Sequence, residues 1–98
     1  MSNPTLHVRI ISPQQLILDT EAVSISSKNT QGNFDILPQH ANFITLIENS
    51  PIIIRVPNPA SRQGGQKSLT FKFPLAIIMT TENKVNIYTY IQPQTEKR

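Results

Sequence analysis

The feature that most constrains the fold of this chain is a two-residue repeat of apolar side chains. In the stretch LHVRII, the apolar residues Leu6, Val8 and Ile10 alternate with His7 and Arg9. The same alternation recurs in EAVSISSK, PIIIRVP, SLTFKF and KVNIYTYI. Because successive side chains of a strand point to opposite faces, this period is typical of strands that bury one face.

Turn-rich segments separate these strands and favour an antiparallel arrangement. They are SKNTQGN, ENSP, PNPASRQGG and TTENK. Pro74 lies between SLTFKF and LAIIMTT. Because proline has no N–H to donate to a neighbouring strand, we expect two strands there with a sharp bend between them. The segment RVPNPASRQGGQK is expected to be a long hairpin loop. Short strands at this spacing, with no helix-length pattern between them, predict an all-β antiparallel sandwich or barrel.

The length of 98 residues suits one domain with one core. We predict that residues 1–92 form the β-domain and that residues 93–98 are a polar tail. No apolar run approaches the roughly 20 residues that a membrane-spanning helix needs. The N-terminal stretch MSNPTLHVRI lacks the features of a signal peptide and predicts a cytosolic protein.

Composition argues against several classes of function. The chain has no Cys and only two His, so a zinc site would need carboxylates from distant segments. Its three Gly form neither a phosphate loop nor a dinucleotide fingerprint. The six acidic residues are scattered, and no Gly-x-Ser-x-Gly elbow occurs. Scattered basic residues and 6% aromatics are not typical of nucleic-acid binding. We therefore expect a binding or structural module, not an enzyme, with no metal, cofactor or small-molecule substrate.

The histidines still need an interpretation. His7 falls on the outward face of its strand and is expected to be exposed. His40 follows Pro38 in the apolar stretch FDILPQHANFITLI. Its imidazole either hydrogen-bonds a nearby backbone group and shapes the turn, or faces a partner protein.

The stretch GNFDILPQHANFITLI resembles a known family signature. That signature, from the epsilon subunit of F-type ATP synthases, has the form Gly-x-Phe/Leu-Gly-Ile-Leu/Tyr-Pro-Gly-His-Ala-Pro-Leu-Ile/Leu-Thr. The upstream segment VRIISPQQLIL is similar to the family's opening strand. The resemblance runs from about Leu6 to Ile91, is most specific between Gly32 and Ile47, and weakens after Val56.

The resemblance implies a fold and a role. The family's N-terminal domain is a flattened antiparallel β-sandwich of about ten short strands, consistent with the strand pattern. A C-terminal helical hairpin follows it in the family, and this sequence is expected to lack that hairpin and its inhibitory function. The resemblance further implies a non-catalytic rotor subunit of the central stalk, linking the gamma subunit to the c-ring and coupling ion flow to ATP synthesis. Such a subunit meets the membrane only through the complex, at the cytoplasmic face of a bacterial inner membrane.

The resemblance assigns site residues by position. Ser12, His40 and Thr45 correspond to positions that face the gamma subunit. The turn Gln31-Gly32-Asn33 corresponds to the part that meets the c-ring. Asn33 stands where the family often has an acidic residue, so hydrogen bonding is expected to replace a salt bridge.

Two substitutions depart from the signature. Asp35 and Gln39 stand where the family commonly has glycine. Either the backbone avoids positive φ at these positions, or the side chains tolerate it at a cost.

A part that transmits torque needs rigidity and large apolar contacts. We expect the outward-facing Ile11, Ile53, Ile78 and Tyr88 to supply such a surface, or else to fill the second side of a sandwich edge. The alternative function is a free-standing β-sandwich module that binds carbohydrate or peptide on the face of Tyr88 and Tyr90. The absence of Trp and the low aromatic content argue against that alternative.

Overall fold

The computed structural model describes residues 4–58 and 65–90, and the described residues form nine strands. They are β1 (Leu6–Ile11), β2 (Leu16–Ala22), β3 (Ser24–Asn29), β4 (Gly32–Ile36), β5 (Phe43–Glu48), β6 (Pro51–Pro57), β7 (Gln66–Lys72), β8 (Leu75–Thr81) and β9 (Lys84–Thr89). In this part of the chain no helix is long and apolar enough to cross a bilayer.

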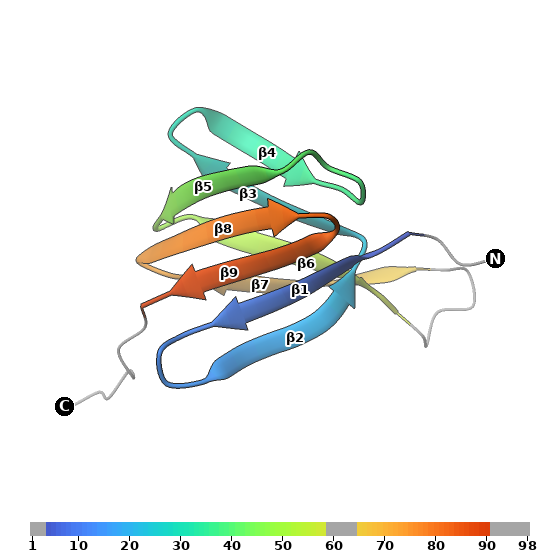
Figure 1. Cartoon of the computed structure of the whole chain (residues 1–98), viewed down its shortest axis with the longest axis horizontal. Helices are drawn as coiled ribbons and strands as arrows, with labels where there is room; N and C mark the ends of the chain where they lie inside the picture. Colours follow the sequence, from blue (N-terminus) through green and yellow to red (C-terminus); the bar gives the residue numbers. More distant parts are fainter. Residues whose placement is uncertain (1–3, 59–64, 91–98) are drawn as a thin grey trace.

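The strands form two stacked sheets, which confirms the predicted all-β sandwich (Figure 1). The five-stranded sheet A has the order β2-β1-β9-β8-β5, and the four-stranded sheet B has the order β4-β3-β6-β7. All neighbouring strands are antiparallel except β1 and β9, which run parallel. The sequence pattern did not indicate this parallel pair, because the two strands come from opposite ends of the domain and no hairpin joins them.

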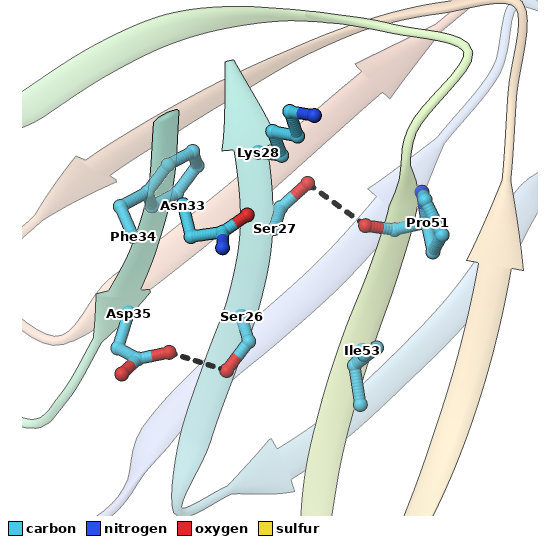
Figure 2. A pocket seen from close by; sticks show the side chains of 8 residues that line it. All are labelled: Ser26, Ser27, Lys28, Asn33, Phe34, Asp35, Pro51 and Ile53. Atoms are coloured by element: carbon cyan, nitrogen blue, oxygen red, sulfur yellow. Dashed lines mark hydrogen bonds between the residues drawn. The ribbon is translucent and has the colours of Figure 1, made fainter. Parts of the chain in front are cut away.

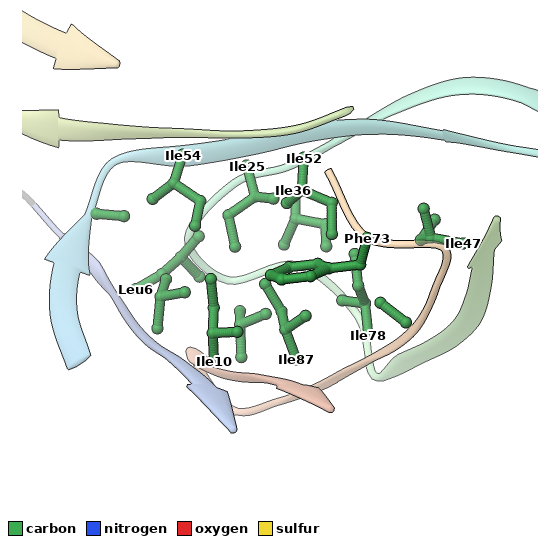
Figure 3. Packing of buried hydrophobic residues seen from close by; sticks show 14 of the residues in the cluster. Leu6, Ile10, Ile25, Ile36, Ile47, Ile52, Ile54, Phe73, Ile78 and Ile87 are labelled. Carbon is green, nitrogen blue, oxygen red and sulfur yellow. The ribbon is translucent and has the colours of Figure 1, made fainter. Parts of the chain in front are cut away.

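The core lies between the sheets and consists mainly of isoleucine (Figure 3). The ring of Phe73 lies between the side chains of the two layers. Complete burial of one isoleucine side chain contributes about 1.5–3 kcal/mol to the stability of the fold. The predicted inward residues of β1, β6 and β9 are buried, so the alternation identified these faces correctly. The buried apolar residues are Leu6, Val8, Ile10, Ala22, Ile25, Ile36, Ile47, Ile52, Ile54, Val56, Phe73, Ala76, Ile78, Val85 and Ile87.

Two predictions about strand faces were wrong. EAVSISSK is not one strand, because the chain leaves sheet A at Ala22, bends at Val23 and enters sheet B at Ser24. The Val23 N–H donates to the Arg55 carbonyl at 2.8 Å and fixes this crossing. Ile78, predicted to face outward, is completely buried. The segment LAIIMTT is apolar at both parities, so its pattern alone could not decide which set of side chains faces the core.

Pro74 separates β7 from β8, as predicted. The hairpin between β6 and β7 is also confirmed by their pairing from Pro51↔Lys72 to Pro57↔Gln66. Its loop is shorter than the predicted segment 55–67, because both ends of that segment belong to the paired strands. Residues 59–64 of its loop lie outside the described residues. Ile91, the predicted domain end at residue 92 and the predicted tail 93–98 also lie outside them.

The Pro-Gln-His segment forms a β-turn with an unusual residue at its third position. The His40 N–H donates to the Leu37 carbonyl at 3.1 Å, and Gln39 has a φ of 68°. Proline at the second position and positive φ at the third are the features of a type II turn, which normally places glycine there. Gln39 therefore tolerates positive φ, whereas Asp35 avoids it. The Gln39 N–H also donates to the side chain of Asn83, which ties this turn to the β8–β9 hairpin.

Gln39→Val should destabilise the fold by about 1–2 kcal/mol, because a β-branched side chain is disfavoured at this φ. The stability of Gln39→Gly should equal or slightly exceed that of the parent. Glycine relieves the strain at this φ, but its greater freedom in the unfolded chain offsets most of the gain. Urea unfolding measures both, with Gln66→Val at an exposed strand position as the control. Equal stability of Gln39→Val and the parent would contradict the strained turn.

Candidate functional site

The outer face of sheet A is the most unusual surface of the described structure. Seven large apolar side chains on it are between 38% and 70% exposed. We call this set the apolar face. It consists of Ile44, Leu46, Leu75, Ile77, Met79, Tyr88 and Tyr90.

Strand register makes the apolar face continuous. On β5 and β8, Ile44 lies opposite Met79, and Leu46 lies opposite Ile77. Ile77 in turn lies opposite Tyr88 of β9. Opposite side chains on one face of a sheet are about 4.5–5.5 Å apart at Cβ, so these side chains are direct neighbours. These five residues span three adjacent strands without a polar interruption at these positions.

A shallow groove lies within the apolar face. Leu75 and Ile77 line it from β8, and Tyr88 and Tyr90 line it from the β9 side. Ile11 of β1 lies opposite Tyr88 and extends the surface with a half-buried side chain. Soluble monomers rarely expose contiguous apolar patches above a few hundred Å², so a surface of this kind indicates contact with another molecule.

The outer face of sheet B is polar by comparison. Arg55 of β6 donates to the Ser26 hydroxyl at 2.7 Å, and that hydroxyl donates to the Asp35 carboxylate of β4. Arg55 also donates to Ser24 at 3.3 Å. Figure 2 shows the Ser26–Asp35 contact and the groove beside it. Of the outward positions predicted to be apolar, Ile53 lies on this face and is half-buried.

Ser12 is buried and holds the connection between β1 and β2. Its hydroxyl donates to the Gln15 carbonyl at 3.1 Å and accepts from the N–H groups of Gln14 and Gln15 at 3.3 and 3.2 Å. The Ser12 N–H donates to the same carbonyl at 2.9 Å. The side chain therefore shapes this turn.

His40 and Thr45 also make contacts within the chain. His40 Nδ1 lies 2.7 Å from the Ala41 carbonyl, and its ring packs edge-on against Phe43 with centroids 5.4 Å apart. The Thr45 hydroxyl accepts from the Asn29 amide at 2.9 Å, which links β5 to β3 of the other sheet. Thr45 is half-buried, whereas Ile44 and Leu46 on either side of it belong to the apolar face.

The three residues predicted to face the gamma subunit do not form one cluster. The turn that contains His40 lies near the start of β1, because Asn83 links the two. The side chain of Asn83 accepts from the Gln39 N–H, and its carbonyl accepts from the His7 N–H. Ser12 follows the other end of β1. A six-residue strand spans about 17–20 Å, so Ser12 and His40 cannot share one small site.

The segment predicted to meet the c-ring is the turn of the β3–β4 hairpin. The Gln31 N–H donates to the Asn29 side chain at 2.8 Å, and Gly32 has a φ of 119°, which favours glycine. Asn33 lies opposite Lys28, and both are exposed. The turn is thus a preformed polar projection at one end of sheet B.

His7 lies between two carboxylates, a cluster that the sequence did not reveal. Its Nε2 is 2.7 Å from Asp19 Oδ1, and its Nδ1 is 3.0 Å from Glu21 Oε2. Strand pairing of β1 with β2 brings these residues together, although 12 to 14 positions separate them in the sequence. Hydrogen bonds from Thr5 first and then from His7 lower the pKa of Glu21 below its ordinary value. The two ring nitrogens of His7 therefore contact different carboxylates. Among the described residues no group of three acidic, His or Cys side chains has the geometry to hold a metal.

Comparison with known proteins gives a family match over most of the chain. Residues 5–90 match the family model described as the ATP synthase delta/epsilon chain, β-sandwich domain. The ATP synthase epsilon chain of Nitratiruptor sp. is 32% identical over 54 residues, which are 55% of this chain and 42% of the relative. The ATP synthase epsilon chain 2 of Paraburkholderia xenovorans is 35% identical over 54 residues, covering 54% of this chain and 37% of the relative. The matched part is thus less than half the length of these curated relatives.

Solved structures share the fold at low sequence identity. A chain of the Euglena gracilis mitochondrial ATP synthase structure (OSCP/F1/c-ring) has a TM-score of 0.74 and 13% identity, over 92% of this chain and 54% of that chain. A chain of the Tetrahymena thermophila mitochondrial ATP synthase structure (central stalk/c-ring) has a TM-score of 0.71 and 15% identity, over 99% of this chain and 78% of that chain. These similarities support the sandwich fold.

Glu21→Gln should reduce the acid sensitivity of the fold. A lowered folded-state pKa gives stability that is present above the unfolded-state pKa and is lost as the pH falls through the folded-state pKa. On acidification from pH 6 to pH 3, the free energy of unfolding should therefore fall further for the parent than for the variant. The difference should be only a few tenths of a kcal/mol, because the carboxylate is largely exposed. Urea midpoints across this range test the difference, with the exposed Glu48→Gln as the control. Parallel pH profiles for Glu21→Gln and the parent would show that the cluster contributes nothing.

Proposed function

Since the chain belongs to the ATP synthase delta/epsilon family through its β-sandwich domain, we propose that it is a non-catalytic central-stalk subunit that links the gamma subunit to the c-ring. In this role it turns with the rotor and helps couple ion flow to ATP synthesis. Its place is the cytoplasmic face of a bacterial inner membrane, where the complex holds it. We propose residues 1–92 as its domain, and the match of residues 5–90 to the family model supports this proposal.

The observation that carries the proposal is the apolar face of sheet A. We assign this face to the gamma subunit, because stable interfaces within permanent complexes are more apolar than ordinary protein surface. Tyr88 and Met79 are side chains of the kinds that are enriched at interfaces. The surface of three hydrogen-bonded strands also suits a contact that must not deform under load.

The rest of the sandwich supports a mechanical role. The two layers are joined by a continuous apolar core and by the Asn29–Thr45 hydrogen bond between β3 and β5. Closely packed interiors have low compressibility and transmit strain. Torque applied at the apolar face therefore reaches the β3–β4 hairpin, to which we assign the c-ring contact at Gln31, Gly32 and Asn33.

Ser12, His40 and Thr45 have distinct parts in this proposal. His40 lies in the turn that precedes β5, and its ring packs against Phe43, so we assign it a contact with gamma beside the start of that strand. Thr45 positions the strand segment that presents Ile44 and Leu46. Ser12 fixes the β1–β2 turn that follows Ile11, at the far end of the same sheet.

Ile77→Glu should abolish the contact with gamma while leaving the fold intact. Ile77 is 40% exposed at the centre of the apolar face, so a carboxylate there would be desolvated in the interface but hydrated in the free chain. We expect the dissociation constant for gamma from the same organism to rise at least about 100-fold, corresponding to about 2.7 kcal/mol. Isothermal titration calorimetry measures it.

Thr70→Glu is the matched control, because it adds the same charge to an exposed strand position on sheet B. It should bind gamma like the parent. Parent-like binding by Ile77→Glu would show that gamma docks elsewhere. Failure of the parent chain to bind gamma at micromolar concentrations would refute the proposed function.

His40→Ala should weaken gamma binding more than it weakens folding. The turn keeps its backbone hydrogen bond to Leu37, so the variant loses only the ring contacts with Ala41 and Phe43. We expect a loss of about 1 kcal/mol or less in urea unfolding and a rise of several-fold or more in the dissociation constant. Unchanged binding would restrict His40 to shaping the turn.

A further inference from the structure

The type II turn from Leu37 to His40 has a side chain at a position that normally holds glycine. Its third residue, Gln39, has a φ of 68°, in the left-handed region. Proline at the second position suits a type I turn equally well, and a type I turn would place Gln39 at negative φ without strain. This sequence therefore favours type I unless another contact stabilises type II.

The two turn types differ in the orientation of one peptide group. Conversion of type II to type I rotates the peptide between Pro38 and Gln39 by roughly 180° and leaves the ends of the turn nearly in place. The hydrogen bond from the His40 N–H to the Leu37 carbonyl is compatible with both types, so it does not select between them. The direction of the Gln39 N–H does distinguish them.

Asn83 makes the contact that stabilises the type II orientation. Its side-chain oxygen accepts from the Gln39 N–H at 2.5 Å. In a type I turn this N–H would point away from Asn83, and the Pro38 carbonyl would point towards it, so that two acceptors would face each other. The strain of positive φ and the net contribution of one hydrogen bond are similar in size, so this single contact is enough to decide the turn type.

Asn83 itself is held in a tight turn between β8 and β9. Glu82 and Asn83 have φ values of 51° and 67°, and the pair Thr81↔Lys84 closes the turn. Positive φ at both central residues is typical of a type I′ hairpin turn, in which Asn and Gly are favoured. The Asn83 carbonyl also accepts from the His7 N–H of β1 at 2.8 Å. The side-chain oxygen of Asn83 is thus presented from a fixed corner of sheet A.

We propose that Asn83 is a positioning residue for gamma binding, because its side chain holds the Pro38–Gln39 peptide in the type II orientation. The Pro38 carbonyl then points away from Asn83, since the C=O and N–H of a trans peptide point in opposite directions. The turn that carries His40 therefore offers an acceptor to a hydrogen-bond donor of gamma, whereas a type I turn would offer a donor there. The inference rests on the proposed function, which assigns His40 a contact with gamma.

Asn83→Gly tests the control of the turn, because glycine keeps the positive φ of the hairpin and removes only the acceptor. The Pro38 Hα and the Gln39 amide proton are close in a type II turn and distant in a type I turn, because ψ of the second residue differs. The nuclear Overhauser effect between them should be strong in the parent and at least about threefold weaker in Asn83→Gly. Asn83→Asp retains an acceptor and should keep the parent signal. A weak signal in the parent, or an unchanged signal in Asn83→Gly, would overturn the inference.

The affinity for gamma tests the consequence for binding. In isothermal titration calorimetry, Asn83→Gly should raise the dissociation constant about three- to tenfold, and Asn83→Asp should stay within about twofold of the parent. The double variant Asn83→Gly/Gln39→Gly should return to within about twofold of the parent, because glycine adopts positive φ without strain and no longer needs the hydrogen bond. A general loss of stability would not be repaired by a second glycine, so this restoration separates positioning from a merely structural effect.

Glu82→Gly is the matched control, because it makes the same kind of replacement at the neighbouring positive-φ residue of the same turn. The described hydrogen bonds of the Leu37–His40 turn do not involve the Glu82 side chain. The control should keep the parent signal between Pro38 and Gln39 and bind gamma within about twofold of the parent. Equal losses of affinity in Glu82→Gly and Asn83→Gly, or a double variant that stays weak, would overturn the inference.

Two outcomes separate this inference from the proposed function. If the parent binds gamma and Asn83→Gly binds it equally well, the positioning role is refuted and the proposed function stands. If the parent does not bind gamma at micromolar concentrations, the proposed function fails, and the positioning role fails with it. In that case the nuclear Overhauser measurement still decides whether Asn83 selects the turn type, because it needs no gamma.

Discussion

The structure depends on the packing of two isoleucine-rich sheet faces against each other. Most strands contribute alternate side chains to this layer, and Phe73 lies between the two sets. Because the period of a strand is two, fixing the inward face also fixes the outward face. The outer surfaces are therefore the places where residues can vary for contacts with partners, and their chemistry indicates function more directly than the core does.

The two outer faces have opposite chemistry. On sheet A, β5 and β8 are apolar at both parities, so the inward residues complete the core and the outward residues form the apolar face. On sheet B, the outward residues include the Arg55–Ser26–Asp35 network and the exposed Lys28 and Lys72. One small domain thus presents an apolar surface suited to a permanent contact and a charged edge suited to an oriented polar contact. This division fits the proposed role of connecting two different partners.

The sequence predicted the fold best where apolar and polar residues alternate strictly. In β1, Val8 is buried and Arg9 is exposed, as the pattern indicates. The prediction failed for Ile78, because LAIIMTT offers two apolar sets and only the packing against β5 and β9 selects one. It also failed at Val23, where the chain changes sheets within an apparently continuous strand. Such choices depend on tertiary contacts that periodicity does not encode.

Residues of the candidate site were likewise predicted only where apolar and polar residues alternate. Tyr88 was predicted to face outward because its strand alternates, whereas Ile44, Leu46 and Met79 were missed in segments without clear alternation. The apolar residues at both parities of β5 and β8 were the signal that could have found them.

Contacts between distant residues, such as His7 with Asp19 or Asn29 with Thr45, required the strand register. The sequence allowed two roles for His40, which are shaping the turn and facing a partner protein. The structure shows the first of these, and the second stays a prediction.

Burial of the apolar face in the assembled complex is the central claim, and the oxidation rate of Met79 tests it most directly. The Met79 side chain is 38% exposed in the middle of that face, so dilute hydrogen peroxide should oxidise it readily in the free chain. Mass spectrometry of the peptide that contains Met79, compared between the free chain and the chain bound to gamma, gives the protection. The account predicts that binding slows oxidation at least about tenfold, because the thioether becomes enclosed. Equal rates in the free and bound chains would contradict it.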